Sequence, residues 1–219
     1  MKKLLLLLGF LMPLSAFSQD SDLGNWLIYI GSKKFSSKWN WHHEVQYRNY
    51  DAIGDLEQLL LRTGIGVNLT ENNNNLLIGY GFIHSQNYFD GLEDKIEVDE
   101  HRIFQQFVTK QSFGRVKVQH RYRFEQRWIE DKPMKLRFRY FLAINVPINN
   151  ADMSPKTFYG SLYNEIFVNT EQVLYDRNRL YVGIGYKLNG NARFEIGYMN
   201  QFLNLVNRDQ INLITFLNF

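Results

Sequence analysis

The sequence predicts an all-β protein, a closed antiparallel transmembrane β-barrel that follows an N-terminal export signal. Three observations carry this prediction. Apolar and polar residues alternate with a period of two, the alternating segments follow one another without a helical interruption, and the chain is 16% aromatic with only four prolines. A period of two is the spacing of a strand whose two faces meet different surroundings. Many aromatic residues with few prolines suit long strands.

Two central segments show the alternation most clearly. In Arg115–Ile129, every second residue from Val116 is mostly apolar or aromatic, and the residues between are nearly all polar or charged. In Lys135–Val146, the alternate residues from Leu136 are all apolar and face away from the arginines. A helix would scatter these charges around its whole circumference, so both segments are predicted strands.

The other strands follow from the same pattern. In Leu23–Lys33, the side chains of Trp26, Ile28 and Ile30 share one face. The Leu56 end of Leu56–Leu69 also has helical spacing, and Glu100–Gln111 has the least regular alternation. Asn189-Gly190-Asn191 is predicted to be a hairpin turn. The remaining segments are Leu23–Lys33, Trp39–Tyr50, Leu56–Leu69, Leu76–Tyr88, Glu100–Gln111, Thr157–Asn169, Arg179–Leu188, Arg193–Phe202 and Asp209–Phe219.

The length of these strands favours a membrane barrel. Strands of soluble sandwiches are usually about 5–6 residues long, whereas a tilted strand needs about 9–11 residues to cross a bilayer. Closure also satisfies every backbone polar group, as lipid requires. Trp26, Trp39, Trp41 and Trp128 fit aromatic girdles at the membrane surfaces. About eleven segments are visible, but bacterial single-chain barrels have an even number of strands, so we expect about twelve, with ten as the alternative.

The N-terminus predicts the destination. Residues 1–18 combine Lys2 and Lys3 with an apolar run and a small-residue end, which is typical of a secretory signal peptide cleaved before Gln19. Residues 19–219 would then form the barrel in the outer membrane of a Gram-negative envelope. Loss of the two lysines lowers the net charge from +3 to +1, which argues against a nucleic-acid partner. The absence of cysteine excludes disulfides and thiolate metal sites.

The chain resembles an uncharacterised bacterial outer-membrane β-barrel family, the domain-of-unknown-function family 2490, common in Bacteroidetes-like bacteria. The resemblance runs over nearly all of the mature chain. It implies an outer-membrane barrel and gives no activity or catalytic residue. It rests on Trp26, Glu100-His101-Arg102 with Gln105-Gln106, Arg121 with Glu125 and Arg127, Arg137 and Arg139, Asn164-Glu165, Asn178-Arg179, and Gly197-Tyr198 with Gln201.

The polar faces predict a charged lumen. Long basic side chains on one wall would point toward glycines on the other walls, and arginines would pair with carboxylates there. Such a lattice either fills the lumen as a plug or lines a narrow, porin-like channel that prefers anions. The predicted lumen charge network consists of Glu44, Arg48, Arg62, Arg102, Arg121, Arg123, Glu125, Arg127, Arg137, Arg139, Glu165, Arg193 and Glu195.

Other functions have weaker support in the sequence. A lipid hydrolase needs a Ser–His pair, yet Ser85 adjoins His84 and so points to the opposite face. A soluble lipocalin-like binding barrel would place apolar residues inside. His42 and His43 also lie on opposite faces, and the acidic loop 89–99 lacks calcium-loop spacing. We therefore expect no enzyme, no catalytic residue, no metal and no cofactor.

The expected partners belong to the envelope. Outer-membrane lipid and lipopolysaccharide would contact the apolar faces of the strands. The barrel-assembly machinery would recognise the C-terminal strand, which ends at the aromatic residue Phe219.

Overall fold

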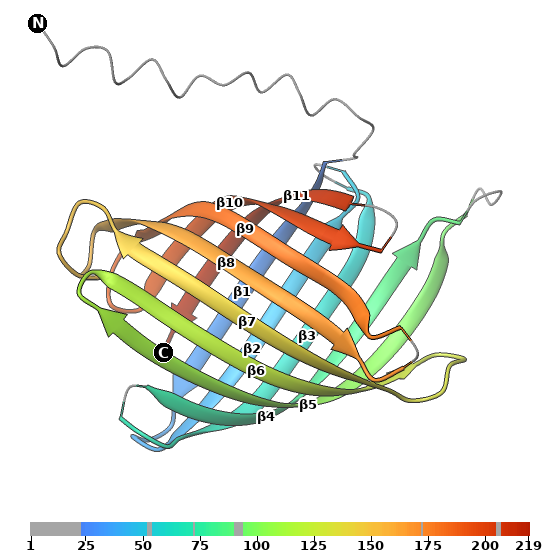
Figure 1. Ribbon diagram of the computed structural model, residues 1–219, viewed down its shortest axis with the longest axis horizontal. Helices are drawn as coiled ribbons and strands as arrows, with labels where there is room; N and C mark the ends of the chain where they lie inside the picture. Colours follow the sequence, from blue (N-terminus) through green and yellow to red (C-terminus); the bar gives the residue numbers. More distant parts are fainter. Residues whose placement is uncertain (1–22, 52–53, 72, 90–93, 172, 205–206) are drawn as a thin grey trace, which may run out of the picture.

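The computed structural model describes residues 23–219 except 52–53, 72, 90–93, 172 and 205–206, and these residues form a closed barrel of eleven strands (Figure 1). The proposed signal peptide lies outside the described residues. No helix in the described part is long and apolar enough to cross a membrane. The strands are β1 (Gly24–Lys34), β2 (Trp39–Asn49), β3 (Leu56–Asn68), β4 (Asn74–Asn87), β5 (Ile96–Phe113), β6 (Val116–Ile129), β7 (Lys135–Pro147), β8 (Thr157–Asn169), β9 (Tyr175–Lys187), β10 (Ala192–Leu203) and β11 (Asn207–Asn218).

The predicted barrel is confirmed, and its closure explains the difficulty with the strand count. Each strand pairs with its sequence neighbours in antiparallel fashion, but β1 pairs with β11 in parallel. Directions alternate along the chain, so an odd number of strands makes the first and the last run the same way. The expected twelfth strand is absent from the described barrel because this parallel pair closes it. Closure is therefore not antiparallel throughout.

The parallel pair puts the two ends of the barrel sequence at opposite rims. The N-terminal rim is the end where β1 begins, and it also carries the connections that follow β2, β4, β6, β8 and β10. The C-terminal rim is the end where β11 finishes, and it carries the short turn at Gly114, whose φ is +56°. Glycine adopts this left-handed conformation without steric cost, which suits the tight β5–β6 connection.

The two faces of the strands divide as the alternation predicts on most strands. On β7, Arg137 and Arg139 are buried in the lumen, while Phe138 is 51% exposed on the outer face. On β9, Arg179 and Tyr181 are buried, while Val182 and Ile184 are both 58% exposed. The outer face of the barrel is thus mainly apolar and the lumen is mainly polar.

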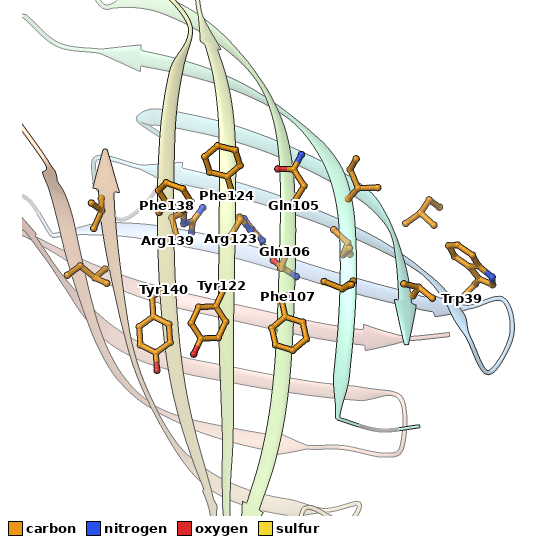
Figure 2. A pocket seen from close by; sticks show the side chains of 17 residues that line it. Trp39, Gln105, Gln106, Phe107, Tyr122, Arg123, Phe124, Phe138, Arg139 and Tyr140 are labelled. Carbon is orange, nitrogen blue, oxygen red and sulfur yellow. Dashed lines mark hydrogen bonds between the residues drawn. The ribbon is translucent and has the colours of Figure 1, made fainter. Parts of the chain in front are cut away.

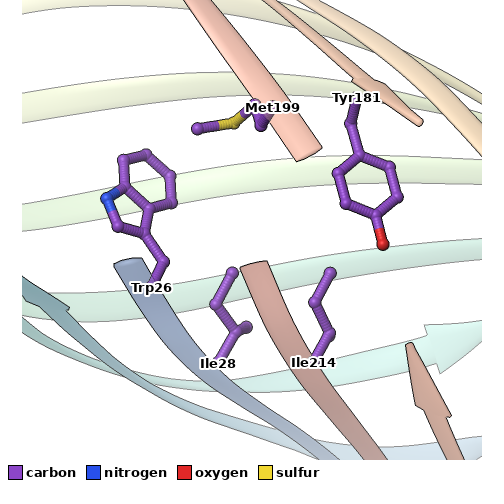
Figure 3. Close-up of a cluster of buried hydrophobic side chains, with 5 residues drawn as sticks. All are labelled: Trp26, Ile28, Tyr181, Met199 and Ile214. Atoms are coloured by element: carbon purple, nitrogen blue, oxygen red, sulfur yellow. The ribbon is translucent and has the colours of Figure 1, made fainter. Parts of the chain in front are cut away.

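The assignment of Trp26 to an aromatic girdle is wrong. Trp26 is 3% exposed and packs inside the barrel with Ile28, Tyr181, Met199 and Ile214 (Figure 3). Its face of β1 points inward because Trp26 pairs in register with Arg48 of β2, which also faces the lumen. The other three tryptophans lie outside as expected: Trp39, Trp41 and Trp128 are 47%, 36% and 43% exposed.

Candidate functional site

The lumen contains a network of arginines and carboxylates drawn from most of the wall. All thirteen residues of the predicted network lie at lumen-facing positions, and ten of them are buried, with Arg121, Arg127 and Arg193 partly buried. Every arginine of the chain except Arg115 lies on the lumen face. The carboxylates that share this space are Glu44, Glu57, Glu100, Glu125, Glu165, Asp176 and Glu195.

Glu125 is the centre of the network. Its Oε2 accepts hydrogen bonds from Nε and Nη2 of Arg137 at 2.9 and 2.6 Å, and its Oε1 accepts one from Nη1 of Arg139 at 2.7 Å. Nη1 of Arg123 lies 3.7 Å from the same Oε1. Glu125 itself is 0% exposed. Removal of this one carboxylate would leave three buried guanidinium groups without their shared counter-charge.

Two further carboxylates extend the network around the wall. Glu165 accepts hydrogen bonds from Arg139 at 2.7 and 3.0 Å and from Arg121 at 2.6 Å, so Arg139 links Glu165 to Glu125. The Glu100 carboxylate accepts hydrogen bonds from the Nε and Nη2 groups of both Arg102 and Arg127. Such two-pronged pairs between guanidinium and carboxylate are stronger and more directional than single neutral hydrogen bonds.

Two β-bulges turn additional acids toward the lumen. Glu57 is the extra residue of β3 opposite the Arg48–Asn49 step, and Asp176 is the extra residue of β9 opposite the Phe167–Val168 step. A bulge breaks the two-residue alternation and re-aims a side chain. Glu57 consequently reaches Arg208 at 2.5 Å, and Asp176 reaches Arg137 at 2.8 Å. Strict alternation would have placed both acids outside.

Aromatic rings provide flat surfaces for the guanidinium groups. Phe167 is 1% exposed, and the guanidinium carbons of Arg139 and Arg179 lie 4.4 and 4.7 Å from its ring centroid. Trp26 stacks against Arg48 at 3.8 Å and Arg179 at 4.7 Å. Cation–π contacts of this kind gain strength away from water. The buried aromatic side chains therefore belong to the charged network.

Glycines on the lumen face leave space for other rings. A Cβ atom on Gly185 would lie 2.2 Å from the ring of Tyr159, and one on Gly197 would lie 2.5 Å from the ring of Tyr181. Tyr159 donates a hydrogen bond to Glu195 at 2.8 Å, and Glu195 also accepts one from Ser161. The absence of a side chain at Gly185 thus leaves room for the Tyr159 ring, whose hydroxyl group bonds to Glu195.

This arrangement predicts the effect of one added methyl group. Gly185→Ala should destabilise the barrel by about 1–3 kcal/mol, because the new Cβ overpacks the Tyr159 ring. Gly160→Ala is the matched control, since nothing lies within 4 Å of a Cβ at that position. Urea unfolding of both variants in the same detergent measures the difference. Equal unfolding midpoints for the two variants would contradict the close packing of the Tyr159 ring against Gly185.

Several side chains of the described lumen are completely buried. Glu125, Tyr159, Tyr181, Gln210 and Asn212 are all 0% exposed, so water does not reach their side chains. An open path along the barrel axis would leave wall side chains accessible. The lattice and its aromatic partners are therefore densely packed at several points along the described lumen.

Comparison with known proteins identifies the family. Residues 23–212, nearly the whole described barrel, match the family described as protein of unknown function (DUF2490). The chain belongs to this family. It is also 31% identical over 169 residues to an uncharacterised protein of Methylorubrum extorquens, covering 72% of this chain and 69% of the relative. No solved structure matches the chain.

The outer face of this DUF2490 barrel carries polar groups that bond to one another. Gln105 and Gln126 exchange amide hydrogen bonds at 3.3 and 3.1 Å, and His120 bonds to the Tyr140 hydroxyl at 2.8 Å. Side-chain hydrogen bonds also join Trp41 to Thr63, Tyr80 to His101, and Asn164 to Asn178. These pairs link neighbouring strands and reduce the number of unpaired polar groups on the apolar surface.

A groove of about 640 Å³ crosses the outer face of the DUF2490 barrel. Figure 2 shows Phe107, Tyr122 and Tyr140 side by side across β5, β6 and β7, with Phe124 and Phe138 in the next row. Trp39, Ile65, Leu76, Ile78, Ile166 and Val168 continue its apolar lining. Most of its lining lies on the outer face of the sheet, opposite the charged lattice, but Arg123 and Arg139 of the lattice also border it.

The histidines considered for catalysis or metal binding have other partners. His84 Nδ1 lies 2.7 Å from Asp99, while Ser85 is bonded to Gln58. His42 contacts Glu44 in the lumen, whereas the ring of His43 lies against that of Trp41 outside, with the two ring planes tilted by 45°. Among the described residues, no group of three or more potential ligands has a metal-binding arrangement. Asp90 and Glu93 of the acidic loop lie outside the described residues.

One charged cluster of the DUF2490 barrel lies outside the lumen, at the N-terminal rim. Lys95 bonds to Asp55 and to the backbone oxygen of Leu56, between the rings of Tyr50 and Tyr88. Burial lowers the pKa of Lys95, but the hydrogen bond and charge of Asp55 outweigh it and raise that pKa above its ordinary value. This cluster joins the β2–β3 and β4–β5 connections.

Proposed function

We propose that this protein is an outer-membrane β-barrel whose lumen is closed by its arginine–carboxylate lattice, and that it serves as a non-conducting component of the cell envelope. The observation that carries the proposal is that polar side chains are inside the barrel and apolar side chains are outside, the reverse of a water-soluble protein. The lumen holds buried ion pairs, while large apolar side chains are exposed on the outside of the strands. A water-soluble barrel would not leave an apolar belt of that extent uncovered.

The outer polar pairs support a lipid environment. A polar group in hydrocarbon has no water to bond with, so it needs a protein partner. Gln105 with Gln126 and His120 with Tyr140 meet that need within the outer face. The apolar groove beside them has a suitable surface for acyl chains. An apolar lumen, as a lipocalin-like barrel would require, is at odds with the buried arginines.

Planar-bilayer recording tests whether the barrel conducts. The purified protein should insert and give no stable current steps, because the lattice occludes the axis at Glu125 and Tyr181. Protease protection of the same sample confirms insertion. Stable steps from the inserted wild-type protein would overturn the closed-lumen proposal.

A narrow anion-preferring channel is the second candidate. The specific observation in its favour is the excess of guanidinium groups over carboxylates on the lumen face. Basic rings attract anions into pores. If current steps appear, a reversal potential that follows the chloride gradient would support this second function.

A further inference from the structure

The arginines of the lumen are unequally supplied with counter-charge. Arg137 and Arg139 each bond to two carboxylates. By contrast, the ion pairs formed among the described residues include neither Arg48 nor Arg179. Both residues are buried, at 6% exposure each. Glu57 acts on Arg48 and Glu165 on Arg179 only from beyond ion-pair distance, and the two arginines also repel each other. A buried charge without an opposite charge in contact is costly, so this pair of groups favours an additional anionic partner.

Amide oxygens are the acceptors that these two arginines have. Arg48 donates to Gln46 Oε1 and, at 2.6 Å, to Gln58 Oε1. Arg179 donates from Nε to Gln201 Oε1 at 2.8 Å, which is the one hydrogen bond of its side chain among the described residues. An anion adds an opposite charge to the hydrogen bonds of a guanidinium group, and a phosphate can accept two of them in a bidentate pair, which adds both energy and specificity. An anion would therefore compete well for the free guanidinium donors.

Trp26 contacts both of these arginines and provides an independent observation. Both guanidinium groups stack on its ring, yet its Nε1–H is buried and has no hydrogen-bond partner. Gln210, on the strand paired with β1, is 0% exposed and its amide nitrogen and oxygen also lack partners. Buried donors without a partner are uncommon in proteins, and a bound water or ion is one explanation for them.

The position of the cluster gives it access to one rim. Arg48 lies near the end of β2, and Trp26 and Arg179 lie near the starts of β1 and β9, which all meet at the N-terminal rim. Arg177 and Arg208 lie close to the same rim, and their side chains are 28% and 22% exposed. Basic side chains thus extend from the rim toward the buried pair.

We infer that Arg48, Arg179 and the indole N–H of Trp26 form a binding site for a phosphate-type anion, entered from the N-terminal rim. The anion would supply the negative charge that the neighbouring carboxylates give to the other arginines. This inference rests on the proposed closed lumen, in which the anion is held at one rim and does not pass through. The phosphate belongs either to a free ion or to a lipid headgroup at the membrane surface.

Tryptophan fluorescence tests the site directly. With Trp39, Trp41 and Trp128 replaced by Phe, Trp26 remains as the reporter, and sodium phosphate is titrated at constant ionic strength into the folded protein. We expect a saturable change in Trp26 emission. Arg48→Gln and Arg179→Gln should each weaken binding by about tenfold or more. Arg115→Gln is the control, because Arg115 lies away from this site and bonds to backbone oxygens of Ile148 and Asn150 in the β7–β8 connection.

Thermal unfolding separates ligand binding from a purely structural role. A bound anion raises the unfolding midpoint of the wild type as phosphate is added. Arg179→Gln should strongly reduce that dependence and leave the midpoint in phosphate-free buffer unchanged or higher, because it removes a buried charge that has no ion-pair partner. A lower midpoint in phosphate-free buffer, with the phosphate dependence intact, would overturn the inference.

A second fluorescence experiment, in lipid vesicles, identifies the source of the phosphate. The protein is reconstituted in phosphatidylcholine vesicles with and without phosphatidic acid, and Trp26 emission is compared. A response to inorganic phosphate supports a free ion, and a response to phosphatidic acid alone supports a headgroup. No response to either overturns the site. That result would leave the closed lumen standing, because the bilayer recording tests it separately.

Discussion

Glu125→Gln should lower the stability of the barrel more than any other single substitution in the lumen. The change keeps the shape of the side chain but removes the charge that Arg137 and Arg139 share at 2.6–2.9 Å. Loss of one partner from a buried ion pair typically costs about 3–5 kcal/mol, because the remaining charge is left uncompensated. Urea unfolding followed by far-UV circular dichroism measures this loss in free energy.

Glu171→Gln is the control for Glu125→Gln. Its carboxylate bonds to Lys135 at 2.9 Å but is 44% exposed. Exposed pairs contribute about 0–1 kcal/mol, so this variant should unfold close to the wild type. If the two variants lose similar stability, Glu125 is not the centre of the network.

Val182→Lys should have the second largest effect, and that effect should depend on lipid. Val182 lies on the outer face near the middle of β9 and is 58% exposed. A lysine at the midplane of a membrane barrel costs about 2–4 kcal/mol, whereas an exposed site in water usually tolerates the change within about 0.5 kcal/mol. Denaturant titration of the protein in phosphatidylcholine vesicles measures the cost.

Leu188→Lys provides the comparison for depth. Leu188 is 45% exposed and follows the end of β9 at the C-terminal rim. Near the interface the cost of a lysine falls to about 0–1 kcal/mol. A small effect at both positions would argue that water, and not lipid, surrounds the apolar belt.

The sequence predicts the barrel and the inward arginines because both depend on a local rule, the alternation of faces. That rule placed Arg137 and Arg139 opposite Phe138, as the structure has them. It did not predict Glu57 and Asp176, because bulges reverse the facing of single residues. Only the pairing register reveals such bulges.

Two other features escaped sequence analysis for physical reasons. Trp26 and Phe167 are apolar and so were expected outside or left unassigned, but guanidinium groups stack on their rings inside. Contacts such as Arg208 with Glu57 join residues 151 positions apart, and they depend on the parallel closure by β1 and β11. The sequence did not predict this closure, because an even number of strands was expected and would have made the first and last strands antiparallel.

The central claim is that the apolar faces contact acyl chains while the arginines face an enclosed lumen. Since the chain has no cysteine, a spin label can be attached to single cysteines introduced one at a time along 135–146. In lipid vesicles, collision with dissolved oxygen should peak at Leu136, Phe138, Tyr140, Leu142, Ile144 and Val146, with minima at the residues between them. Peaks in collision with a water-soluble nickel chelate at those six positions, or oxygen maxima at Arg137 and Arg139, would contradict the account.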